Sequence, residues 1–162
     1  MTINDFKKHS NFFEIQIIFI ILQKQNQINI VTHKKMSYYR HIYHIVFRTY
    51  KNDYAINEEH EKELYSFIWG YCQNNGHYLH RIGGMPDHLH ILVELKPDIS
   101  VSDFVQVVKQ SSSRMLKNNP NFPLFRGWQK SFGSFSYCKS ELETVKRYIM
   151  NQKKHHKQKT FI

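Results

Sequence analysis

The segment His88–Leu95 constrains the fold more than any other part of the chain, because its apolar residues recur at every second position. Successive side chains of a β-strand point to opposite faces, so this alternation predicts a strand with one aliphatic face. We expect that face to pack against helices. It comprises Leu89, Ile91, Val93 and Leu95. The same alternation places His88 and His90 together on the other face.

Further strands and helices follow from the rest of the pattern. Strands are predicted at residues 38–50, 77–82 and 132–138, and helices at residues 58–75 and 102–117. Gly76 supplies the stop of the first helix, and residues 83–87 form a turn that pairs 77–82 with 88–95 as a hairpin. Ser140 and Glu143 form a capping box that starts a last helix. The order β-α-β-β-α-β-α predicts an α+β, ferredoxin-like split βαβ sandwich with an extra C-terminal helix, which carries Tyr148.

The charge of the chain points to a polyanionic partner. Its 162 residues fit one domain, and the formal net charge is +10 with a pI near 9.6. Cys72 and Cys138 form no zinc-binding or redox pair, which favours a reducing, cytoplasmic setting.

The first 35 residues are the exception to this single-domain pattern. Residues 12–22 are nearly all apolar and follow Lys7 and Lys8, so they imitate a secretory signal. The run is too short to cross a bilayer, and no small-residue cleavage site follows it. We therefore predict that residues 1–35 are an N-terminal extension or a start-site artefact, with Met36 as the true start. The domain then spans residues 36–162, without a membrane partner. An export or membrane role for residues 1–35 stays the alternative.

The paired histidines have two readings. Imidazoles two residues apart on one strand face can reach a single cation. They are as readily two polar residues on the exposed face of a half-buried strand. Asp87, directly before them, either orients an imidazole or is an ordinary turn residue after Pro86.

The last helix carries a second pair. Tyr148 and Gln152 are four residues apart, so they share a helix face, beside the apolar stripe of Leu142, Val145 and Ile149. A tyrosine in that place is often a boundary residue with a packed ring and a solvated hydroxyl.

Cations crowd the same helix. They complement the helix dipole, but their density is better explained by contacts to phosphate groups. The predicted DNA contacts are Arg114, Lys146, Arg147, Lys153, Lys154, His155 and Lys157.

Three segments in this order resemble a known family. They are Pro86-Asp87-His88-Leu89-His90 with its aliphatic run, the stretch from Trp128 to Ser136, and Tyr148-Ile149-Met150-Asn151-Gln152 followed by Lys153-Lys154-His155-His156-Lys157. Together they are similar to the single-tyrosine HUH transposases, of the TnpA type of small bacterial insertion sequences, in the IS200-like superfamily. Members usually start near the position of Met36, and many continue beyond the basic helix.

The resemblance implies a transposase that cuts and rejoins single-stranded DNA with hairpin ends, as a homodimer. It implies Tyr148 as the nucleophile, through a 5′-phosphotyrosine intermediate, and His88, His90 and Gln152 as ligands of a divalent metal. Because a phosphate oxygen completes such a site, Mg²⁺ or Mn²⁺ is expected rather than structural zinc. The resemblance favours a site composed across two chains, and the residues alone leave that open. Tyr137 is the next candidate nucleophile.

Two other functions fit parts of the pattern. A split βαβ sheet is also the architecture of RNA-recognition modules, in which Tyr39, Tyr43 and Phe47 would stack on bases without catalysis. A metal-dependent phosphohydrolase would use water in place of Tyr148.

Overall fold

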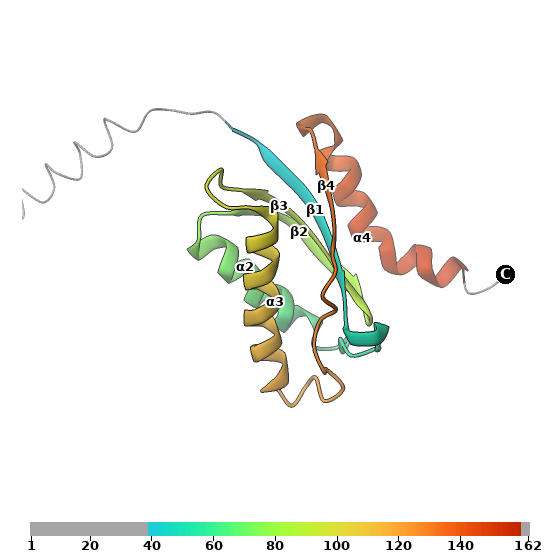
Figure 1. Ribbon diagram of the computed structural model, residues 1–162. Helices are drawn as coiled ribbons and strands as arrows, with labels where there is room; N and C mark the ends of the chain where they lie inside the picture. Colours follow the sequence, from blue (N-terminus) through green and yellow to red (C-terminus); the bar gives the residue numbers. More distant parts are fainter. Residues whose placement is uncertain (1–38, 160–162) are drawn as a thin grey trace, which may run out of the picture. The chain divides into compact units, whose positions relative to one another are not determined.

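The computed structural model describes residues 39–159, which form a four-stranded antiparallel sheet with helices on both faces (Figure 1). The elements in chain order are β1 (His41–Arg48), α2 (Glu61–Asn74), β2 (Tyr78–Met85), β3 (His88–Leu95), α3 (Val101–Lys117), β4 (Gly133–Tyr137) and α4 (Leu142–Lys159). Short 3₁₀ turns at Tyr50–Asn52 and Lys139–Glu141 precede α2 and α4. The predicted order of strands and helices is therefore confirmed. Residues 1–35 lie outside the described residues.

The sheet order is β2-β3-β1-β4, which is the order of a split βαβ fold. In the central pair, β1 runs antiparallel to β3, and Val46 lies opposite His90. β4 pairs with the other edge of β1. This register decides which side chains of β1 meet the histidines of β3.

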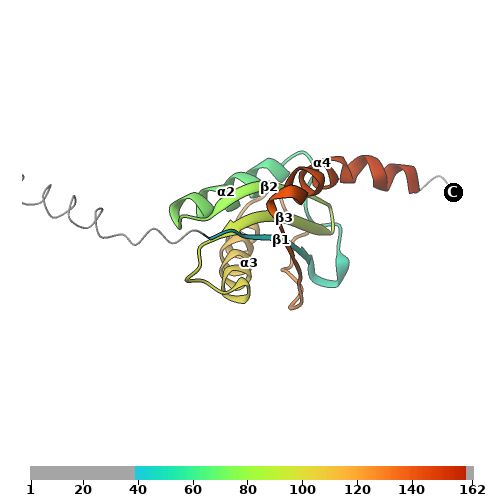
Figure 2. The same ribbon diagram turned by 90° about the horizontal axis from the view of Figure 1, so that it is seen from above.

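The two faces of the sheet carry separate cores. The predicted aliphatic face of β3 packs against α2 and α3 and is fully buried, as expected. On the other face, Ile42 and Leu92 pack under Val145 and Ile149 of α4. Figure 2 shows α4 lying close to β2 and β3. Burial of each aliphatic side chain contributes about 1.5–3 kcal/mol, so α4 is fixed on the sheet by its stripe.

The hairpin between β2 and β3 is tighter than the sequence predicts. Gly83, Gly84 and Met85 belong to β2, and the turn is Pro86–Asp87 alone. A Cβ on Gly84 would lie 2.3 Å from the carbonyl oxygen of His88, so only glycine permits this close approach. A Cβ on Gly83 would lie 3.0 Å from the Ile149 side chain, so this position also lets α4 lie near β2.

The start of the last helix also differs from the prediction. The Glu141 carboxylate accepts a hydrogen bond from the backbone N–H of Cys138 at 3.0 Å, two residues before the predicted capping box. Glu143 instead pairs with Lys146 at 2.8 Å. Ser140 and Glu143 are therefore the wrong pair, because the chain turns through a 3₁₀ segment before α4 begins. Within residues 39–159, no helix combines the length and the apolar character that crossing a bilayer requires.

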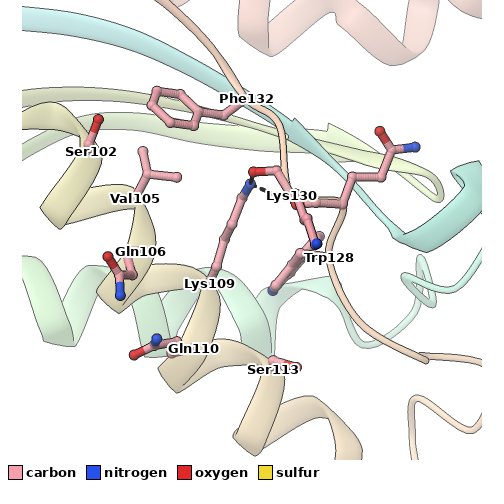
Figure 3. Close-up of a pocket in the computed structure, with 10 residues that line it drawn as sticks. Ser102, Val105, Gln106, Lys109, Gln110, Ser113, Trp128, Lys130 and Phe132 are labelled. Carbon is pink, nitrogen blue, oxygen red and sulfur yellow. Dashed lines mark hydrogen bonds between the residues drawn. The ribbon is translucent and has the colours of Figure 1, made fainter.

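One lysine ties α3 to the segment that leads into β4. Lys109 Nζ donates to the backbone oxygens of Gln129, Lys130 and Ser131 at 2.9, 3.2 and 2.8 Å. Figure 3 shows this side chain reaching from α3 between Trp128 and Phe132, at a pocket of about 530 Å³. The contact holds the approach to β4 against the domain.

Replacing Lys109 by Met should lower the free energy of unfolding by about 1–3 kcal/mol, since carbonyl groups lose a charged donor. Lys117→Met, at the exposed end of α3, is the matched control and should change stability by less than about 0.5 kcal/mol. Urea unfolding measures both values. Equal stabilities of the two variants would contradict a tethering role for Lys109.

Candidate active site

His88 and His90 lie on the face of β3 that α4 covers. Each is only 5% exposed, so the reading as polar residues on an exposed strand face is wrong. The physical reason is the extra helix: Val145, Ile149 and Gln152 of α4 are buried over the same face. The histidines thus form part of a closed layer between sheet and helix.

Asp87 orients His88. Its Oδ1 atom lies 2.6 Å from His88 Nδ1, and its Oδ2 atom accepts from Arg48 Nη1 at 2.8 Å. Thr49 fixes the turn, because its backbone N–H donates to the Asp87 carbonyl oxygen at 2.9 Å. Asp87 is thus a residue of the Pro86–Asp87 turn, and its carboxylate also orients an imidazole. A carboxylate on Nδ1 leaves the His88 Nε2 atom directed at α4.

His44 of β1 orients His90 through its Nδ1 atom, as Asp87 orients His88. The two rings stack with centroids 5.0 Å apart, and His44 Nε2 lies 2.8 Å from His90 Nδ1. Burial lowers the pKa of His44, which favours its neutral form. Sequence reasoning missed His44, although a single histidine between Ile42 and Val46 on a buried strand is a signal. The contact fixes His90 with Nε2 directed at α4.

Gln152 of α4 is the point where both imidazoles converge. Its amide nitrogen lies 3.2 Å from His88 Nε2 and also contacts His90 Nε2. Its Oε1 atom is buried, and among the described residues it has no hydrogen-bond partner. Rotation of the amide by half a turn exchanges the two atoms and places the oxygen toward both nitrogens. The amide can therefore donate to the imidazoles or, with its oxygen turned toward a bound cation, serve as a third ligand beside them.

The donor set fits a divalent cation with an incomplete protein shell. In residues 39–159, no group of three or more His, Cys, Asp or Glu side chains is placed to hold a metal. Two imidazoles and an amide oxygen are a different set: three neutral ligands, with positions left for other oxygen atoms. Structural zinc would require a fourth protein ligand, and none of the described residues supplies one here.

Tyr148 lies at the edge of this layer, as its place beside the apolar stripe predicts. Its side chain is 49% exposed, and its ring centroid lies 6.0 Å from that of His90 in the same chain. The ring is also 6.1 Å from that of His44. Tyr137, the other candidate, is partly buried and packs against Ile42 and Leu92. A half-exposed phenol beside two imidazoles can meet a substrate that arrives from solvent.

The predicted DNA contacts do not form one group. Arg147 is exposed on α4, and Lys146 pairs with Glu143 near it. Lys153 contacts Glu61 and Glu58 at 2.6 and 3.4 Å, so it anchors α4 to the start of α2. Arg114 is exposed on α3, on the opposite face of the sheet. The side chains of Lys154, His155 and Lys157 lie outside the described part of the chain.

The aromatic residues of β1 do not offer a base-stacking surface. Phe47 is 1% exposed and lies with Tyr43 in the core under α2 and α3. Tyr39, which is 40% exposed, precedes the strand. The RNA-recognition hypothesis is therefore wrong in its central element, because the rings of Phe47 and Tyr43 face the core.

Comparison with known proteins gives the family. A sequence model described as "Transposase IS200 like" matches residues 37–152. No curated protein matches the chain. Two solved structures share the fold. A protein from Deinococcus radiodurans R1 that is assigned as a transposase is 24% identical, with a TM-score of 0.55 over 73% of this chain and 95% of that one. A REP-associated tyrosine transposase bound to a REP hairpin is 16% identical, with a TM-score of 0.57 over 75% and 74% of the two chains. On the family match, which covers most of its length, this chain belongs to the IS200-like transposases.

Proposed function

We propose that the chain breaks and rejoins single-stranded DNA, with Tyr148 as the covalent nucleophile beside a divalent-metal site of His88, His90 and Gln152. The observation that carries this proposal is the convergence of both Nε2 atoms on the buried Gln152 amide, with Tyr148 one helical turn away on α4. The family match supports DNA transposition as the overall process.

The reaction needs few groups. The Tyr148 oxygen forms a bond to the scissile phosphorus while the bond from phosphorus to the 3′ oxygen breaks, and the phenol proton is replaced by one on the released 3′-OH. The 5′ end stays on the protein as a phosphotyrosine. Because one phosphodiester replaces another, a second 3′-OH can reverse the step without an external energy source. A Mg²⁺ or Mn²⁺ ion, when bound, would neutralise the charge that develops on the phosphate.

The surrounding residues serve this chemistry by fixing atoms in place. Asp87 and His44 each contact an Nδ1 atom, so both Nε2 atoms are directed at the α4 side, where Gln152 contacts them. Lys153 locks α4 to α2 through two carboxylates, which keeps Tyr148 and Gln152 in register with the strands. The test uses single-stranded DNA from the ends of the insertion sequence, called element ends below. The chain should become covalently attached to this DNA with Mg²⁺ or Mn²⁺, and should remain unattached when a chelator is present.

The preferred substrate is a hairpin with single-stranded flanks. A solved relative is described as bound to a REP hairpin, and the net charge of +10 suits a polyanion. A single strand can bring its phosphate to the half-exposed Tyr148 without any cost of melting a duplex.

The protein should therefore bind DNA with single-stranded segments more tightly than duplex DNA, and its affinity should depend on salt. We expect a hairpin with single-stranded flanks to compete at least 10-fold better than a perfect duplex of equal length. Affinity should fall by about 10-fold between 50 and 200 mM salt, as counterions compete for the phosphates. Fluorescence anisotropy measures both effects. Arg147→Ala should flatten the salt dependence more than Arg114→Ala does, because Arg147 lies on α4. A duplex that competed equally would contradict the proposed substrate.

We propose a homodimer as the working unit. One Tyr148 holds one 5′ end at a time, whereas excision and resealing require two open ends together, and two-fold pairing is the commonest way to bring two copies together. The sheet offers β2 and β4 as its edges. Sedimentation velocity would measure the assembly, and a monomer that completed strand exchange would contradict this argument.

Mixing two inactive chains tests how the sites are composed. Tyr148 lies beside His90 of its own chain, so we expect a mixture of Tyr148→Phe and His88→Ala chains to stay inactive. If sites were composed across chains, the mixed dimer would contain one intact site and would cleave. Native mass spectrometry verifies that heterodimers form, and cleavage by them would refute the within-chain arrangement.

A further inference from the structure

A pocket beside Tyr148 extends to residues of β4 and α4 that have no role in the proposed cleavage step. Its volume is about 410 Å³, within the range of small-ligand sites. It lies between the edge strand β4 and α4, with β1 beneath. Its lining is His44, Phe135, Tyr137, Thr144, Val145 and Tyr148.

The register of the sheet turns aromatic rings into this pocket. Phe135 lies opposite His44 and Tyr137 lies opposite Ile42, so both point to the α4 face. Phe135 is 56% exposed, and its ring centroid is 6.3 Å from that of His44. Across the pocket, Tyr148 presents a second half-exposed ring. Two exposed rings on opposite walls of one mainly apolar pocket form a stacking site rather than scattered surface residues.

We infer that this pocket binds one nucleobase of the DNA strand, next to the phosphate that Tyr148 attacks. The inference rests on the proposed function and adds the place where the strand is held. Because Tyr148 is itself a wall of the pocket, an occupant must be an immediate neighbour of the group that meets its hydroxyl. A single strand presents such a neighbour as an unpaired base, and a duplex does not.

The lining also sets how selective the site is. Aromatic stacking accepts every base, since each has a π-face. Thr144 supplies a hydroxyl at the rim, whereas His44 Nε2 already contacts His90. We therefore expect the pocket to bind a base tightly, with little preference among the four bases. A stacked base would fix the strand and so place the adjoining phosphate for attack.

Binding of fluorescein-labelled oligo(dT) of about 20 nucleotides tests the pocket without any cleavage. Phe135→Ala should weaken binding by about 10-fold, the loss of one stacked base, and Phe135→Trp should restore it. Trp69→Ala is the matched control, because Trp69 is 54% exposed on α2, over the opposite face. Wild-type affinity of Phe135→Ala, or an equal loss in the control, would overturn the inference.

Photo-crosslinking locates the base directly. The same oligonucleotide with 5-iododeoxyuridine in place of one thymidine, scanned along its length, should crosslink to tryptic peptide 131–139, which holds Phe135 and Tyr137. The Tyr148→Phe chain serves as the protein, so no covalent cleavage product interferes. Crosslinks confined to other peptides would overturn the pocket. Crosslinking at this peptide in Tyr148→Phe, together with a wild-type chain that never forms a cleavage adduct, would keep the pocket and refute the proposed function. A wild-type adduct without crosslinks at this peptide would refute the pocket and keep the proposed function.

Discussion

The Tyr148→Phe chain should form no detectable covalent adduct with single-stranded element ends, while the wild-type chain forms one that survives denaturant. The substitution removes the only atom that would bond to phosphorus. The side chain is 49% exposed, and the ring stays, so folding and DNA affinity should be unchanged. Denaturing gel electrophoresis with labelled DNA measures the adduct, and anisotropy measures binding.

Tyr137→Phe is the matched control for this result. Tyr137 lies on β4 and its ring is 6.3 Å from that of His44, so it is the other tyrosine near the site. Its variant should form the adduct at the wild-type level. An adduct that persisted in Tyr148→Phe and vanished in Tyr137→Phe would move the nucleophile to β4.

Replacing His88 or His90 by Ala should lower cleavage by about 100-fold or more, since a cation on the phosphate is worth several kcal/mol to the transition state. Both side chains are buried with hydrogen-bond partners, so each variant should also lose about 1–3 kcal/mol of folding stability. Titration with Mn²⁺, followed by electron paramagnetic resonance, should show weaker metal binding. This readout separates a ligand from a merely structural histidine.

His80→Ala controls for the loss of a buried imidazole. Its side chain is 7% exposed on β2, and it lines a different pocket under α4 with Lys146. We expect this variant to lose comparable stability and to keep Mn²⁺ affinity and cleavage. If all three histidine variants lost activity only in proportion to stability, His88 and His90 would be structural residues.

The strands and helices could be predicted from the sequence because each has a clear local pattern of apolar residues. The alternation in β3 specifies which face meets α2 and α3, and Gly76, which has a φ of 70°, ends α2 as predicted. Helical spacing alone predicts that Tyr148 and Gln152 share one face of α4. Turn boundaries are weaker: Gly83 and Gly84 read as loop residues, but they are small residues in a strand, where α4 and the next strand approach closely.

Relations between elements could not be read in the same way. His44 reaches His90 only because Val46 pairs with His90, and no local pattern specifies that register. Lys153 looks like one more cation of a DNA-binding helix, yet the fold brings Glu61 and Glu58 to it. The burial of His88 and His90 depends on α4 folding back over the sheet. These three misses therefore each concern a contact between residues far apart in the chain.

The most direct test of the account is the site of attachment of DNA on the wild-type chain. Trypsin cleaves after Arg147 and Lys153, so peptide 148–153 isolates Tyr148 from every other tyrosine. After reaction with single-stranded element ends and nuclease digestion, mass spectrometry should find a nucleotide on this peptide through a phosphotyrosine bond, and a chelator should remove the signal. Attachment on peptide 131–139, or cleaved DNA with no attached peptide, would contradict Tyr148 as the nucleophile.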